Sequence, residues 1–473
     1  MKWTIRNQQN VPLANPMAAD VRRRVRTEEW RDALVVTCKP LLKDSKAGLL
    51  LALILATGML FYVRRVLVPY QRADAAAHDH PRGNLSDLYP RWLGARELLR
   101  HGRDPYSLEI TREIQIGYYG RALNASRAGD PRDQQAFAYP VYVVFLLAPI
   151  VGMPFQVIRP SFYGLLAVLI AASVLVWLRV LRWKPSSVNV ASLILLVLGS
   201  MPVLQAIELQ QLTLLVAALL ALCALLLVTR KFAMAGIVLA LATIKPQLVL
   251  PLAAWLIFWA ASDWRRRRNF VWGFAAAMMI LIGAGEWILP GWIAEFLHAV
   301  SAYQQYTRNA SLFDNLTSAG WGPVLSVAIT LIAAAICRRL RRDSEQSPRF
   351  VFSLTLVLAV TLVIVPTIST YNQVLLLPAV LLLVRQAPQL WKQSRVSATV
   401  WILAAAAVAW PWIAALALTV ASFILPAARV QQAWALPFYT NLMTPLAILG
   451  LLFQYGFRVL SSGQPVQYSS AAG

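Results

Sequence analysis

The residues best suited to chemistry in this 473-residue chain are an acid and an amine that stand beside long apolar runs. Asp87 follows the first apolar run and opens an amphipathic helix that is expected to end at Gly102. Lys245 precedes Pro246 inside an apolar hairpin, where a cation is costly and often functional. A carboxylate can take a proton from a hydroxyl, and an amine can stabilise developing negative charge. The pair therefore predicts chemistry on a hydroxyl and an anion at a membrane surface.

Other polar residues are expected at the same side of the membrane and complete a candidate binding site. They fall at the expected outer turns or in the outer loops, where an outward-facing site would gather them. These candidates are Arg91, Tyr139, Gln210, Gln211, Asn315, Tyr371 and Asn372.

Each candidate also has a purely structural interpretation. Asp87 could cap the helix that follows it, with Ser86 as the rival cap. Lys245 could extend to the interface as an orienting lysine. The amides could satisfy helix ends, Tyr139 could anchor the interface, and Arg91 could face lipid headgroups.

The composition predicts the scaffold for these residues. The chain is 58% hydrophobic and 14% charged, with a mean hydropathy of +0.57. Apolar runs of about 18–22 residues recur from Ala47 onward, and each is long enough to cross a bilayer. We therefore expect an all-α integral membrane protein, a polytopic bundle of about twelve helices.

The net charge of +23 could suggest nucleic-acid binding, but its placement argues against that function. Basic residues cluster in short segments between apolar runs, as the positive-inside rule requires of cytoplasmic loops. We expect a plasma-membrane (inner-membrane) protein with both termini inside and the site facing the exterior. The expected spans are 47–68, 161–181, 189–207, 210–229, 232–244, 246–262, 270–289, 323–338, 350–367, 372–385, 399–419 and 437–457.

The domain organisation follows from this topology. Residues 1–46 form a basic cytoplasmic tail, 47–457 the membrane domain and 458–473 a second cytoplasmic tail. Residues 69–160 form the first outer loop, which contains interfacial and re-entrant helices, and 290–322 form the second. The apolar stretch 138–157, broken by Pro149 and Pro154, is expected to be re-entrant rather than spanning, and to line a lipid groove.

Several motifs in this order resemble glycosyltransferase family 87, the polyprenyl-phosphate-sugar-dependent transferases of the class C integral-membrane glycosyltransferases. An acid, a helix and a G-x-x-P-Y turn occur at Asp87 and at Gly102 to Tyr106. A Y-P-P-like segment lies at Tyr139-Pro140, with Val141 replacing the second proline. Three further segments are similar to the family's later motifs: Gln211-Leu212-Thr213-Leu214-Leu215, with Gln210 in place of glycine and Thr213 in place of asparagine; Ala235-Gly236 to Lys245-Pro246; and Asn315 with Asn372-Gln373.

The resemblance implies transfer of a sugar, most commonly mannose but alternatively arabinose, from a polyprenyl phosphate to an acceptor lipid or glycan with inversion. Asp87 would be the base, and Lys245, or secondly Arg91, would stabilise the leaving phosphate. The remaining candidates would contact substrate. No cofactor is expected, because the lipid-linked sugar phosphate is a substrate. No second carboxylate at metal spacing flanks Asp87 and the three cysteines form no C-x-x-C pair, so we expect no metal.

Rival functions remain open at this point. A secondary transporter or lipid flippase would need ionisable residues near the membrane midplane, whereas Glu208, Lys245 and Glu286 all fall near the outer side. A non-enzymatic scaffold would make Asp87 replaceable. A ligase that moves a preassembled glycan would use similar chemistry. The composition leaves the oligomeric state undecided.

Overall fold

The computed structural model describes residues 45–77, 86–124, 126–127, 130–131, 133–307, 310–317, 320–366, 369–391 and 395–461. Every regular element within these ranges is helical, as the composition predicted. Most of the tail at 1–46, the segment from Gly83 to Leu85 and most of the tail at 458–473 lie outside the described residues. The helices are α2 (Ser45–Tyr62), η1 (Val63–Leu67), α3 (Val68–Ala77), α4 (Leu88–His101), α5 (Leu108–Tyr119), α6 (Val143–Leu147), η2 (Ala148–Ile150), α7 (Phe155–Val180), α8 (Ser187–Leu198), α9 (Met201–Glu208), α10 (Thr213–Val228), α11 (Phe232–Ala242), α12 (Pro246–Ala261), α13 (Trp264–Ile288), α14 (Trp292–Thr307), α15 (Leu312–Leu316), α16 (Trp321–Leu340), α17 (Pro348–Ile364), η3 (Thr370–Leu376), α18 (Leu377–Trp391), α19 (Arg395–Ile424), α20 (Ala427–Gln432), η4 (Leu436–Phe438) and α21 (Met443–Ser461).

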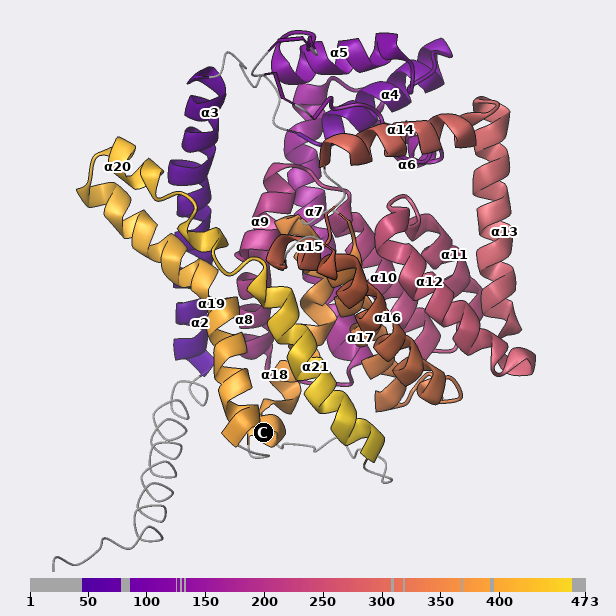
Figure 1. The fold of residues 1–473 in the computed structure, drawn as a ribbon, viewed down its shortest axis with the longest axis vertical. Coiled ribbons are helices and arrows are strands. Elements are labelled where there is room, and N and C mark those ends of the chain that lie inside the picture. The colour runs from indigo at the N-terminus through magenta and orange to yellow at the C-terminus, as the bar shows by residue number, and fades with distance from the viewer. Residues whose placement is uncertain are drawn as a thin grey trace, which may run out of the picture.

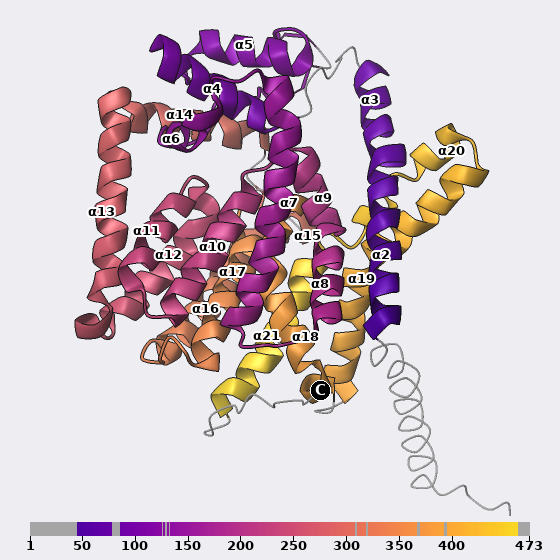
Figure 2. The same cartoon turned by 180° about the vertical axis from the view of Figure 1, so that it is seen from behind.

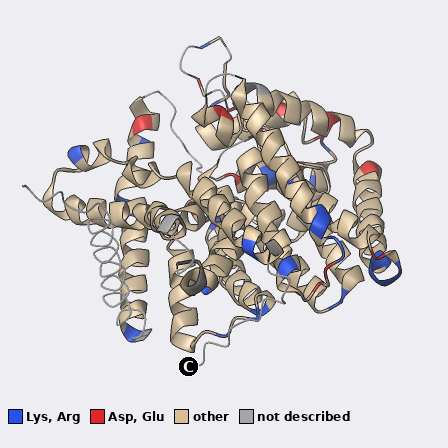
Figure 3. Cartoon of the chain, turned by 60° about the horizontal axis from the view of Figure 1, so that its bottom comes forward, with Lys and Arg blue, Asp and Glu red and all other residues tan. Residues whose placement is uncertain are grey.

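The two ends of the bundle differ in character. Helices α4, α5 and α14 lie across one end, at the top of Figure 1, and the long helices run away from them (Figures 1 and 2). The opposite end carries the connection between α12 and α13 and the start of α13 with Arg265 to Arg268, and Figure 3, with this end turned forward, shows Lys and Arg on several helices and turns. This distribution is compatible with the positive-inside rule if the end that carries Arg265 to Arg268 faces the cytoplasm and α4 faces outward.

The expected twelve spans are not supported. Six helices among the described residues are long and apolar enough to cross a bilayer, or seven if the bent pair α8 and α9 counts as one. The expected span 189–207 is this pair, bent by 57°. Four other expected spans are shorter apolar helices, namely α10, α11, α12 and α17. Hydropathy recognises that a segment is apolar, but the length of its helix depends on where tertiary contacts break it.

The first outer loop folds largely as its sequence predicts. Helix α4 ends at Gly102, which has a φ of 66° and the left-handed conformation that glycine adopts without strain. The stretch 138–157 is not one span: it contains only α6 and the short η2, which includes Pro149, and Pro154 precedes α7. Tyr139 and Tyr142 are buried in the main core, whereas Leu146, Met153 and Val157 of the same stretch are exposed, and the expected lipid groove stays a prediction.

The hairpin that carries Lys245 is held by a close helix contact. Helices α11 and α12 are joined by a short turn, and α11 packs along α13. A Cβ atom at Gly236 would lie 2.2 Å from the Phe270 carbonyl oxygen, so only glycine permits this approach of the two backbones. The contact fixes α11 and, through the turn, the position of Lys245 at the start of α12.

Candidate active site

Asp87 and Lys245 are joined through the side chain of Gln211. Gln211 Nε2 donates a hydrogen bond to Asp87 Oδ2, and Gln211 Oε1 accepts one of 2.6 Å from Lys245 Nζ. Gln211 and Lys245 are 3% and 5% exposed, whereas Asp87 is half-buried. An amide has one donor end and one acceptor end, so it can bridge an acid and an amine without reversing either bond.

The carboxylate of Asp87 does not cap helix α4. Asp87 occupies the N-cap position, but its side chain makes no capping hydrogen bond, and the Leu88 N–H donates instead to Ser86 Oγ over 3.2 Å. The Asp87 N–H donates to the Leu209 carbonyl oxygen over 2.8 Å, which ties the start of α4 to the turn after α9. The structural role considered for Asp87 is therefore taken by Ser86, and the Asp87 carboxylate is directed to Gln211.

Gln210 shapes the turn that presents Gln211. Its φ is 53°, in the left-handed region that side-chain-bearing residues seldom adopt. The fully buried side chain accepts a hydrogen bond from Ser86 Oγ and donates one of 2.9 Å to the Arg159 carbonyl oxygen. These two bonds compensate for the backbone cost, and the positive φ explains why glycine is suitable at this position of the motif.

Lys245 is surrounded by polar and aromatic groups from three further elements. Its Nζ donates a second hydrogen bond of 2.7 Å to Thr213 Oγ1, and Thr213 in turn donates to Asn372 Oδ1 over 3.2 Å. The ring centroids of Tyr371 and Tyr139 lie 5.3 Å and 5.8 Å from Nζ, within cation–π range. An ammonium has three donors, so one N–H of Lys245 has no acceptor among the described residues.

Arg91 also lies against the ring of Tyr139. Its guanidinium carbon is 4.5 Å from the centroid of the Tyr139 ring, and Nη1 donates to the Asp87 carbonyl oxygen over 2.7 Å. Its Nε is buried without a hydrogen-bond partner among the described residues. Arg91 thus brings a second cation, with an unused donor, to the same site.

Burial shifts the proton affinities of the acid and the amine toward each other. Burial raises the pKa of the Asp87 carboxyl above its usual value and Asp133 adds to this, while Arg91, Lys245 and the Gln211 hydrogen bond oppose it. Burial likewise lowers the pKa of Lys245, helped by repulsion from Arg91 and opposed by Asp87. A carboxylate of raised pKa is a stronger base at neutral pH, which suits proton abstraction.

One expected member does not join this cluster. Asn315 is an exposed residue of α15, and its Nδ2 donates to the Ser311 carbonyl oxygen over 2.9 Å. None of the described contacts connects Asn315 with Asp87 or Lys245. The sequence predicted its position in the outer loop. Its side-chain amide, however, is bound to the residue that precedes its own short helix, α15.

The structure adds residues that spacing did not single out. Ser86 is fully buried and supports Gln210, and Asp133 lies close enough to raise the pKa of Asp87. Asp133 also accepts two hydrogen bonds from Gln135. No periodicity marks Asp133, because it lies in an irregular part of the first outer loop. Within the described part of the chain, no three His, Cys, Asp or Glu residues lie close enough together to hold a metal ion.

The geometry provides a half-buried carboxylate, a buried amine and an amide that connects them. The cluster around Asp87 is drawn from five separate turns and helices and comprises Arg91, Tyr139, Gln210, Gln211, Lys245, Tyr371 and Asn372. Such a site can remove a proton from an acceptor and stabilise an anionic leaving group on its other side.

Comparison with known proteins identifies the class of the chain. Residues 137–366 match the sequence model of Glycosyltransferase family 87. The matched segment contains Tyr139, Gln211 and Lys245, while Asp87 precedes it. No curated protein matches the chain. Through residues 137–366, this membrane protein belongs to glycosyltransferase family 87 and is a glycosyltransferase.

Proposed function

We propose that the protein transfers a sugar from a polyprenyl-phosphate donor to a hydroxyl group of a glycolipid or glycan, with inversion, on the outer face of the plasma membrane. The observation that carries this proposal is the bridge from Asp87 through Gln211 to Lys245. It sets a base and a cation at the two ends of one short polar connection. Transfer from a phosphate-linked donor needs a base for the acceptor and positive charge at the leaving group.

Asp87 is the proposed base. Its Oδ2 is occupied by Gln211, and Oδ1 has no hydrogen-bond partner among the described residues, so Oδ1 is the oxygen available to an acceptor hydroxyl. The acceptor oxygen forms a bond to the anomeric carbon, and its proton moves to Asp87. The bond between the anomeric carbon and the phosphate oxygen breaks, and its electron pair leaves with polyprenyl phosphate. Attack opposite the leaving group inverts the anomeric centre.

Lys245 is the proposed partner of the leaving phosphate. The third N–H of its ammonium has no acceptor among the described residues, and its burial strengthens any contact with an anion. A bound phosphate would favour the ammonium form, which offsets the lowered pKa of the empty site. Because the leaving group is already an anion, no general acid is required. Arg91 supplies the second positive charge through its unused Nε.

Mannose is the proposed sugar and arabinose the alternative, both on the analogy with the family. A donor screen tests the proposal most directly. Purified protein in nanodiscs would receive polyprenyl-phosphate-mannose or polyprenyl-phosphate-arabinose together with a membrane-lipid extract, and products would be identified by mass spectrometry. We expect a new glycosylated lipid or glycan with one of these donors. Transfer from nucleotide-linked sugars alone would exclude polyprenyl-phosphate sugars as the donor class.

The transporter and scaffold alternatives are less well supported. The family match indicates group transfer, and the buried cation lies against an amide that faces a carboxylate rather than along a path through the bundle. Reconstituted vesicles distinguish the classes, since a flippase would move labelled polyprenyl phosphate across the bilayer without forming a glycosylated product.

A further inference from the structure

A groove of about 430 Å³ lies between the C-terminal halves of α16 and α21. Its lining residues recur every three or four positions along each helix, so each set forms one helical face. They are Ile332, Ala335, Ile336 and Arg339 of α16 and Phe453, Phe457 and Leu460 of α21. The groove therefore has apolar walls and one cationic side chain.

The cation lies at the mouth of the groove, where the two helices end. Both α16 and the helical stretch that contains α21 are long and apolar enough to cross a bilayer, and Arg339 and Leu460 are the next-to-last residues of the two helices. The Arg341 carbonyl oxygen accepts hydrogen bonds from Ser262 Oγ and Arg267 Nη1, which places this mouth at the basic end of the bundle. Seven residues of helix extend about 10 Å. The apolar walls thus reach about a third of the way through a hydrocarbon core of about 30 Å, which keeps them within one leaflet.

The groove is open to its surroundings rather than enclosed. Helices α16 and α21 each pack against α17, and α16 turns the buried residues Ala333, Cys337 and Leu340 away from the exposed face. Phe457 is 75% exposed and Ile332 is 48% exposed. Apolar walls that face outward along two candidate spans are suited to contact with a hydrocarbon chain of the bilayer.

The guanidinium of Arg339 is available to a ligand. Arg339 is exposed, and it makes no hydrogen bond or ion pair with any described residue. Arg338 and Arg342 are also exposed, so three positive charges lie within four residues at the mouth of the groove. A guanidinium binds a phosphate through two parallel N–H donors, and a basic cluster of this kind favours a headgroup with net negative charge.

The acids in the connection to α17 do not neutralise Arg339. Glu345 is fully buried and binds Arg230 and Arg266 instead, over 2.7 Å and 2.5 Å. The other acid, Asp343, forms no ion pair with Arg339 in the part of the chain that the structure describes. The mouth of the groove therefore keeps its positive charge.

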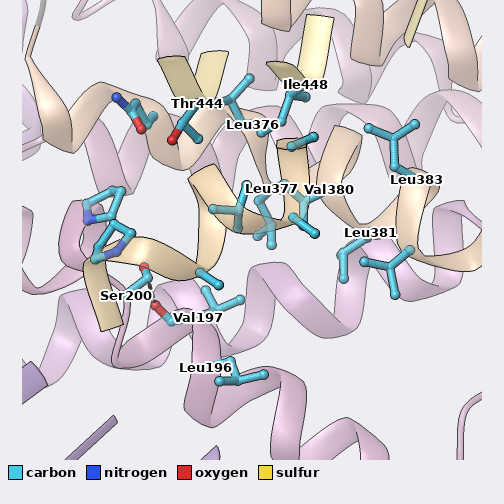
Figure 4. Close-up of a pocket in the computed structure, with 18 of the residues that line it drawn as sticks. Leu196, Val197, Ser200, Leu376, Leu377, Val380, Leu381, Leu383, Thr444 and Ile448 are labelled. Atoms are coloured by element: carbon cyan, nitrogen blue, oxygen red, sulfur yellow. Dashed lines mark hydrogen bonds between the residues drawn. The ribbon is translucent and has the colours of Figure 1, made fainter. Parts of the chain in front are cut away.

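A second cavity of similar volume shows what this charge adds. That cavity, also about 430 Å³, is enclosed mainly by α8, α9, η3, α18, α19 and α21 (Figure 4). Its described lining residues are apolar except for Ser200, Gln373 and Thr444, and none of them is charged. It provides no charge that would select one apolar ligand over another, whereas the groove between α16 and α21 combines apolar walls with an available cation.

We infer that this groove binds one anionic phospholipid, with the headgroup phosphate on Arg339 and an acyl chain between the apolar faces of α16 and α21. The lipid would connect α16, inside the segment 137–366 that matches the family, to α21, which lies beyond it. Neither a sugar donor nor an acceptor enters this inference, so it does not rest on the proposed function.

The first test compares two lipids that differ only in their headgroups. The full-length protein would be delipidated in detergent and titrated with dioleoyl phosphatidylglycerol or dioleoyl phosphatidylcholine, and native mass spectrometry would measure the Kd of the first bound lipid. We expect a Kd about tenfold or more lower for phosphatidylglycerol. Arg339→Gln should raise that Kd about tenfold or more, because a charge-assisted hydrogen bond is lost. Arg265→Gln, an exposed arginine at the same end but outside the groove, should leave it unchanged.

The second test asks whether the chain occupies the groove. Ala335 lines it, whereas the neighbouring Ala334 is exposed and does not. Ala335→Trp should weaken phosphatidylglycerol binding about tenfold, because the indole fills the space between the helices, and Ala334→Trp should not. Phosphatidylglycerol with a diazirine on its acyl chain, photolysed with the wild-type protein in nanodiscs, should label α16 or α21. This label decides the question even if Ala335→Trp fails to fold.

Four results would overturn the inference. They are equal affinities for the two lipids, an unchanged Kd in Arg339→Gln, labelling confined to other helices, and competition by inorganic phosphate as effective as that by the lipid. A lipid-free dimer that Ala335→Trp dissociates would also overturn it, since a second copy of the chain would then occupy the groove. Sugar transfer is not part of any readout, so the lipid site and the proposed function can fail independently.

Discussion

Lys245 Nζ donates a 2.6 Å hydrogen bond to Gln211 Oε1, and the other end of the same amide binds Asp87. Rotation of the Gln211 amide would place its NH₂ group against the ammonium and its oxygen against the carboxylate, which both partners disfavour. The acid and the amine therefore fix the orientation of Gln211, and Gln211 fixes the separation between them.

Replacing the proposed base should strongly slow transfer but retain donor binding. Asp87→Asn keeps the shape and a hydrogen bond to Gln211, yet it cannot accept the acceptor proton. We expect kcat to fall by about 10²–10⁴-fold, the usual contribution of a general base. Radiolabelled sugar transfer measures the rate, and equilibrium binding of the donor measures folding of the site. The control is Glu109→Gln, an exposed acid on α5. Wild-type turnover in Asp87→Asn would remove Asp87 from the base role.

Removing the buried ammonium should weaken use of the phosphate-linked donor. Lys245→Met deletes the positive charge and leaves Gln211 Oε1 and Thr213 Oγ1 without their donor. A hydrogen bond with a charged partner contributes about 1.5–3 kcal/mol, so kcat/KM should fall by about ten- to a hundredfold. Lys231→Met, an exposed lysine at the other end of α11, is the matched control. Equal kinetics for the two variants would show that Lys245 only orients the hairpin.

The rate should depend on pH through both shifted groups. Asp87 acts as carboxylate, so activity falls as the pH drops through its raised pKa, at a pH above the usual value of about 4. Lys245 acts as ammonium, so activity falls as the pH rises through its lowered pKa, below the usual value of about 10.4. A plot of the logarithm of kcat/KM against pH should therefore be bell-shaped. The bell should be narrower than the one expected for a carboxyl and an amine with unshifted pKa values.

Gln211→Met provides a directional check on the acid limb. The Gln211 hydrogen bond stabilises the charged form of Asp87 and lowers its pKa, so its loss should move the acid limb to higher pH. One lost hydrogen bond to a charged group corresponds to about one pH unit. The same pH–rate assay measures the shift. A limb that stays in place, or moves to lower pH, would contradict the bridge as described.

The backbone at Gln210 gives a prediction about stability. Gln210→Ala and Gln210→Gly both lose the side-chain hydrogen bonds to Ser86 and to the Arg159 carbonyl, but only alanine retains the left-handed strain at φ 53°. The glycine variant should be more stable than the alanine variant by about 1 kcal/mol. Thermal unfolding in detergent compares the two. An alanine variant as stable as the glycine variant would show that the turn relaxes without strain.

Much of the site was predictable because its chemistry is local to short motifs. Asp87 after the first apolar run, Lys245 before Pro246 and the amides Gln211 and Asn372 were identified from residue type and position. Asn315 satisfied the same criteria, yet it binds its own helix, because a loop position alone does not say which direction a short helix will face. Asp133 was missed for the opposite reason, since nothing in its surrounding sequence is periodic.

The sequence by itself determined that this protein is a helical membrane protein with an acid and a cation next to its apolar runs. Those properties follow from composition and from where charges interrupt apolar runs, which are local features. Only the tertiary structure decided that Gln211 joins Asp87, 124 residues away, to Lys245, and that Tyr371 and Asn372 of η3 lie beside Lys245 and Thr213. The tertiary structure also decided how many helices are long enough to span the membrane. These features depend on how helices bend and pack against segments that are distant in the sequence. Hydropathy is evaluated over one segment at a time, so it carries no information about that packing.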